Sequence, residues 1–168
     1  MVMIMRKIAF LAPLALLATP TAAQENPASA AEIVDAIEAC KAITSADWLE
    51  LKALPSRGWK EYRKSGGRRA QVVRGAYEKA GNEALIIIGK DDLKAKACTV
   101  FARLESTSDY GPTAQAVSQL VGMPTRAEGS TYFWTLDDGK SMRVDPTGDR
   151  DKPIARFEIT APAQESAE

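Results

Sequence analysis

The strongest constraint on the fold is a pair of cysteines, Cys40 and Cys98, which stand 58 positions apart. Cys40 belongs to an apolar stripe at helical spacing, shared with Ile33, Ile37 and Ile43, and a capping-box pattern at Ser29 and Glu32 precedes it. Cys98 lies in an alternating segment, 97–105, on the more uniformly apolar side. Both side chains are therefore expected to face the core. We predict a structural disulfide between an early helix and a strand.

The N-terminus bears on the state of these thiols. Arg6 and Lys7 precede an apolar run at 8–18, and small residues follow at 21–23. This is the three-part layout of a secretory signal peptide, with cleavage expected between Ala23 and Gln24. The run falls short of the ~20 apolar residues that a spanning helix needs, so we expect no transmembrane segment after cleavage. The alternatives are an uncleaved N-terminal anchor and a hydrophobic helix of the fold.

Export would determine the oxidation state expected for the two cysteines. A periplasmic or secreted location is oxidising, and two thiols there usually pair. The alternative is a pair of reactive or metal-binding thiols. Redox enzymes favour the closer C-x-x-C spacing, and a zinc site needs two further ligands. The disulfide is therefore the favoured interpretation.

The rest of the chain predicts one α+β domain. We expect a flexible lead-in at 24–28, a single domain at 29–160 and a disordered tail at 161–168. Alternating or continuous apolar segments predict strands at 84–89, 97–105, 131–136, 140–144 and 154–160. A further helix is expected from Pro112, with the stripe Ala114, Val117, Leu120 and Val121, ending at Gly122. Short connections favour an antiparallel or mixed sheet with helices packed on one face.

The region before residue 80 is harder to interpret. Trp48, Leu49, Leu51 and Leu54 predict a short helix that Pro55 terminates. Residues 59–64 predict a strand, and residues 68–80 fit a helix or a loop equally well. Asp91-Asp92 is expected to begin a connection between strands, and Asp138-Gly139 indicates a hairpin turn.

The layout resembles small uncharacterised exported proteins of alphaproteobacteria. The shared features are the signal peptide, the early helical cysteine, Gly58-Trp59, the Cys-Thr-Val segment at 98–100, and a late tryptophan with a hairpin. The resemblance covers most of the exported chain and implies no activity.

Several chemistries are excluded or weakly indicated. The chain has no histidine, which excludes Ser-His and Cys-His mechanisms and histidine-ligated metals. Gly139-Lys140-Ser141 lacks the leading glycine of a P-loop. Alternating oxygen-bearing residues from Asp145 to Asp151 suit either weak calcium binding or, as we expect, a polar turn. No motif indicates a cofactor, a metal or a catalytic residue, and we expect none.

The most distinctive feature is charge segregation. Residues 24–168 carry a net charge of −2, yet residues 57–79, which we name the basic segment, carry +6. Aromatic residues are interleaved with the cations and suit an interface with an anionic partner. The residues expected to contact it are Arg57, Trp59, Lys60, Tyr62, Arg63, Lys64, Arg68, Arg69 and Arg74. The alternative is that the cations are merely solvated, or are neutralised by the chain's own acidic residues at 137–151.

These observations favour an exported, non-enzymatic binding or accessory domain of the bacterial cell envelope. The expected partner is an anionic envelope protein or polyanion; an exported chain seldom meets nucleic acid. The alternative is a small hydrolase of cell-wall sugar or peptide that uses paired carboxylates such as Asp91-Asp92 or Asp137-Asp138. A purely structural envelope protein is a third possibility.

Overall fold

The computed structural model describes residues 26–62 and 73–161. The described chain forms an eight-stranded sheet in the order β1-β2-β3-β4-β8-β7-β6-β5, and every neighbouring pair is antiparallel. The strands are β1 (Lys60–Glu61), β2 (Val73–Lys79), β3 (Asn82–Gly89), β4 (Ala97–Arg103), β5 (Arg126–Glu128), β6 (Thr131–Thr135), β7 (Ser141–Gly148) and β8 (Pro153–Thr160). The predicted α+β class, with an antiparallel sheet, is confirmed.

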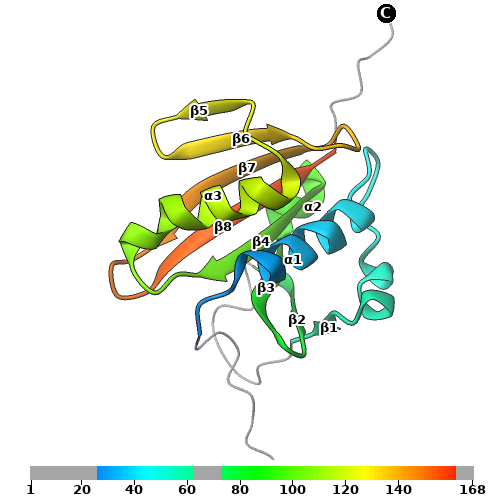
Figure 1. Cartoon of the computed structure of the whole chain (residues 1–168). Coiled ribbons are helices and arrows are strands. Elements are labelled where there is room, and N and C mark those ends of the chain that lie inside the picture. Colours follow the sequence, from blue (N-terminus) through cyan, green and yellow to red (C-terminus); the bar gives the residue numbers. More distant parts are fainter. Residues whose placement is uncertain (1–25, 63–72, 162–168) are drawn as a thin grey trace, which may run out of the picture.

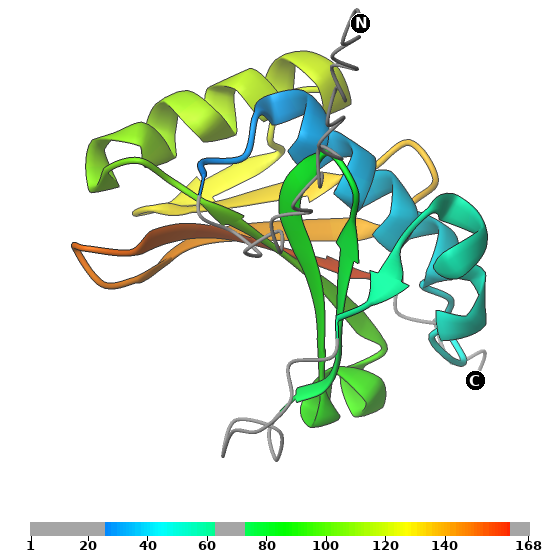
Figure 2. The same cartoon turned by 90° about the horizontal axis from the view of Figure 1, so that it is seen from below.

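Helices α1 (Ala30–Ile43) and α3 (Tyr110–Val121) lie on one face of the sheet (Figure 1). Figure 2 shows both on the same side, whereas the short helix α2 (Lys90–Ala95) lies at the ends of β3 and β4, away from them. The core fills the space between the two long helices and the sheet, where alternate residues of β8 are completely buried: Ala155, Phe157 and Ile159. Within residues 26–62 and 73–161, no long helix covers the other face of the sheet, and we name it the open face.

The predicted disulfide is present. Cys40 in α1 and Cys98 in β4 are bonded, with their Cα atoms 5.4 Å apart and both side chains fully buried. The predicted cap is present too, because the Ser29 hydroxyl accepts a hydrogen bond from the Glu32 amide. The disulfide therefore joins the last turn of α1 to a central strand of the sheet.

The region before residue 80 differs from expectation. Residues 45–54 form no α-helix; instead two 3₁₀ turns follow one another, Leu51–Ala53 and Pro55–Arg57. Pro55 begins the second turn, because its missing amide costs nothing at a first helical position. Trp48, one of the four residues on which the expected helix depended, is 60% exposed. Residues 73–79 are a strand, not a helix or a loop.

Two further predictions need correction. Helix α3 begins at Tyr110, and Leu120 is 58% exposed while Ser118 is buried, because the helix turns its apolar stripe toward α1 and β8. Asp145 and Thr147 do not begin a turn; they lie in β7, whose pairing with β8 runs as far as Gly148. Strand β5 was not predicted.

Both edges of the sheet are protected. Edge strand β1 has two residues and β5 has three, and all but Ala127 in these strands are charged. Short, charged edges discourage pairing with strands of another chain. A partner is therefore expected to meet side chains rather than an unpaired backbone edge.

Candidate functional site

The basic segment lies at the β1 edge of the sheet. Its described parts are the end of the second 3₁₀ turn, strand β1 with Tyr62, and strand β2. Strands β1 and β2 are adjacent, with Lys60 opposite Glu78 and the Tyr62 amide donating to the Ala76 carbonyl oxygen. The predicted contact residues Arg63, Lys64, Arg68 and Arg69 lie outside the described residues.

Trp59 does not belong to an exposed surface. Its side chain is 0% exposed and is part of the core. Gly58 adopts a positive φ of 85°, ending the 3₁₀ turn, and the Trp59 amide donates to the Leu54 carbonyl oxygen. The ammonium of Lys79 lies 6.0 Å from the centre of the indole ring. The Gly-Trp pair is thus explained by packing, because glycine permits the reversal that turns the indole inward.

Three cations of the basic segment are exposed: Arg57, Lys60 and Arg74. None of them forms an ion pair with another described residue. Neutralisation by the chain's own acidic residues at 137–151 is not seen for these three. In that acidic stretch, Asp137 pairs with Lys41 and Asp138 pairs with Lys140.

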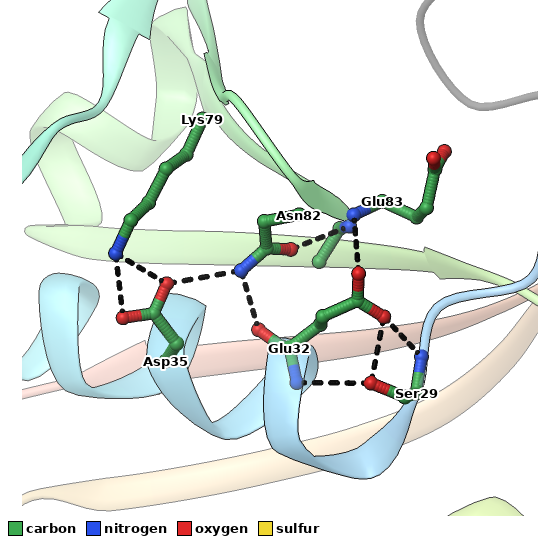
Figure 3. Close-up of polar contacts among 7 residues, drawn as sticks. Ser29, Glu32, Asp35, Lys79, Asn82 and Glu83 are labelled. Carbon is green, nitrogen blue, oxygen red and sulfur yellow. Dashed lines mark hydrogen bonds and ion pairs between the residues drawn. The ribbon is translucent and has the colours of Figure 1, made fainter.

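Lys79, the last cation of the segment, has a structural role. Its ammonium donates to both carboxylate oxygens of Asp35, at 2.9 and 2.8 Å, and the Asn82 side-chain amide donates to the same carboxylate at 2.9 Å. Asn82 also donates to the Glu32 carbonyl oxygen at 3.0 Å. Figure 3 shows these residues joining α1 to the turn between β2 and β3. We name Asp35, Lys79 and Asn82 the clasp.

Glu32 also contributes to the contact between α1 and the start of β3. Its carboxylate accepts hydrogen bonds from the Ser29 amide at 2.7 Å and from the Glu83 amide at 3.2 Å (Figure 3). Burial alone would raise the pKa of Glu32, but these hydrogen bonds outweigh burial and lower it. A carboxylate held ionised in this way is a fixed acceptor rather than a proton donor.

Asp137 and Asp138 do not have the raised pKa of an acid catalyst. The hydrogen bond from Lys41 lowers the pKa of Asp137. Burial opposes ionisation of Asp138, but its hydrogen bonds with Lys140 prevail and lower that pKa as well. A general acid of a glycosidase needs the opposite, a raised pKa. In the other pair, the Asp92 carboxylate accepts from the Gly89 amide at 2.7 Å.

The calcium alternative gains no support. Asp145 accepts hydrogen bonds from Thr131 at 2.8 Å and Arg143 at 2.7 Å, and Asp149 accepts from the amides of the turn that follows β7. Among the described residues, no group of three or more acidic or cysteine side chains could hold a metal ion.

The clasp was missed because its residues come from separate segments. The turn itself carried a signal: Gly81 is the second residue of the two-residue loop between Lys79 and Asn82, and it has a φ of +75°. Such a glycine predicts a hairpin. It does not predict that a helix carboxylate will meet the hairpin.

Comparison of the chain with protein-family models, curated proteins and solved structures finds no match. In the described part of the chain, no helix combines the length and the apolar character that crossing a bilayer would require. The function must therefore be argued from the chemistry of the surface.

Proposed function

We propose that this protein is an exported, non-enzymatic domain of the bacterial cell envelope that binds an anionic partner through the basic segment. The partner is an acidic face of an envelope protein or an envelope polyanion. The proposal depends mainly on one observation: exposed Arg57, Lys60 and Arg74 have no ion-pair partner among the described residues.

Two further features support the proposal. The buried disulfide is compatible with an oxidising compartment. In the sequence, the exposed cations flank a stretch that contains four more, so positive charge is concentrated in one part of the chain. Concentrated charge of one sign attracts a partner of the opposite sign and speeds its association.

The test compares two triple charge reversals that change the net charge equally. One is Arg57→Glu, Lys60→Glu and Arg74→Glu. The control reverses exposed cations elsewhere: Lys94→Glu, Arg150→Glu and Lys152→Glu. The probes are lipopolysaccharide and polyglutamate, and the affinity of purified protein is measured over a range of salt concentrations.

We expect the first triple to bind at least tenfold more weakly, with a flatter salt dependence, and the control to stay within about twofold of wild type. Equal losses in both triples would mean that only net charge matters, and the proposal would then be wrong. Absence of wild-type binding to both probes would also contradict it. Circular dichroism of each variant excludes unfolding as the cause.

A further inference from the structure

A second candidate site lies on the open face, beside the start of strand β2, where Val73 is opposite Gly89 of the pocket lining. It is a pocket of about 390 Å³. Its lining includes Ile87, Lys90, Asp91, Thr99, Phe101 and Arg156. They are brought together by the sheet register, which sets Ile87 opposite Thr99 and Phe101 opposite Arg156, while the start of α2 forms one wall. The volume lies within the range of about 300–1,000 Å³ typical of small-ligand sites.

Thr99 is the most informative residue of this pocket. Its side chain belongs to a central strand and is only 3% exposed. No described residue forms a hydrogen bond with its hydroxyl. Every fully buried polar side-chain atom of the described residues does have a hydrogen-bond partner, so the Thr99 hydroxyl is not fully buried. Solvent must therefore reach the hydroxyl, and the pocket that Thr99 lines is the space through which it does so. An almost buried polar group without a partner is a favourable place for a ligand atom.

The pocket walls carry both signs of charge. Lys90 and Asp91 are exposed and form no ion pair with another described residue. The Arg156 guanidinium is bonded to Glu158 through one nitrogen, which leaves further N–H donors for a ligand. A pure anion would meet the carboxylate of Asp91, and a pure cation would meet Lys90 and Arg156.

The floor of the pocket is apolar, which favours a ligand with an apolar group. Ile87 and Phe101 are partly exposed on the open face and lie diagonally across β3 and β4. Their side chains can bury an aliphatic group, which is favourable because apolar surface is removed from water. The site thus combines donors, acceptors and an apolar surface.

We propose that this pocket binds a small zwitterion with an aliphatic side chain, a free amino acid of the leucine type. The carboxylate is held by Arg156 and the Thr99 hydroxyl, the ammonium by Asp91, and the side chain lies on Ile87 and Phe101. This site adjoins strand β2 of the basic segment, but its ligand is a small zwitterion rather than an anionic macromolecule, so the two proposals can fail separately.

The test is an NMR titration of the purified full chain, labelled with ¹⁵N, using leucine as the probe. N-acetyl-leucine removes the ammonium, leucinamide removes the carboxylate, and glycine removes the side chain. We expect leucine to give saturable shifts at the amides of residues 87–92 and 99. The three other compounds should bind at least tenfold more weakly.

Variants of the protein test whether leucine binding depends on the pocket residues. Thr99→Val keeps the side-chain shape and breaks no hydrogen bond, and Asp91→Asn changes an exposed residue, so both should fold; each should weaken leucine binding at least fivefold. Thr135→Val, on the same face outside the pocket, should leave binding unchanged. Absence of saturable shifts, shifts elsewhere on the protein, or equal binding of leucinamide and leucine would overturn the proposal.

Discussion

Breaking the Cys40–Cys98 bond should cost this fold a large part of its stability. The bond closes a loop of 58 residues, and its removal lets the unfolded chain explore many more conformations. In the chain-entropy treatment, a loop of this length corresponds to about 4 kcal/mol at 25 °C. Since single domains are stable by only about 5–15 kcal/mol, the loss should greatly lower the urea concentration at the unfolding midpoint.

The assay is urea unfolding at pH 7 of oxidised wild type, reduced wild type and the double variant Cys40→Ala/Cys98→Ala. Reduced wild type keeps both buried sulfur atoms, so it separates loss of the bond from loss of packing. We expect a decrease of about 4 kcal/mol on reduction and a somewhat larger one in the double variant, because truncating buried side chains adds a packing cost.

A decrease below about 1 kcal/mol on reduction would refute the reasoning, because it would mean that the unfolded chain gains little freedom when the loop opens. Free thiols that alkylate in freshly purified native protein would contradict it at an earlier step, since both cysteines are bonded and fully buried.

Three further predictions concern single residues. Gly148→Ala should destabilise the protein by about 2–4 kcal/mol in urea unfolding, because φ at Gly148 is +82° and the new Cβ would lie 2.2 Å from the Lys152 carbonyl oxygen. The control is Gly111→Ala on α3, where the new Cβ meets open space, and this change should be neutral or stabilising. Trp59→Ala should cost about 3–5 kcal/mol if the indole is core, and a loss below about 1 kcal/mol would contradict this. Lys41→Met should raise the Asp137 titration midpoint seen by carboxyl NMR, because the hydrogen bond from Lys41 lowers that pKa. The ion pair stabilises the fold only while Asp137 is ionised, so the stability difference between wild type and Lys41→Met should shrink as the pH falls below about 4.

Much of the fold was predictable because it follows from local periodicity. The stripe containing Cys40 has helical spacing, and α1 buries it; the alternation around Cys98 has a period of two, and β4 buries that side. These two patterns point both cysteines inward independently. The disulfide could therefore be predicted without knowing the order of the strands.

Other elements were not predictable, because competing local signals are weak there. Residues 45–54 contain apolar side chains at helical spacing, yet the chain forms turns in which Ser45 bonds the backbone of Trp48. Serine competes for backbone groups in this way and disfavours a helix. The strand at 73–79 was ambiguous because a bulge interrupts its register with β3, so its pattern does not alternate cleanly.

The candidate sites also combine features that local sequence predicts with features that depend on tertiary packing. The sequence by itself determined the helix, the main strands, the covalent link and the concentration of positive charge at 57–79, since each of these depends on residues close together in the chain or on composition. Only the tertiary structure decided that Trp59 is core, that Lys79 belongs to the clasp, and that the Thr99 hydroxyl opens into a pocket. Burial and pairing depend on which distant segments pack together, and that is set by the global arrangement of helices on the sheet rather than by any local pattern.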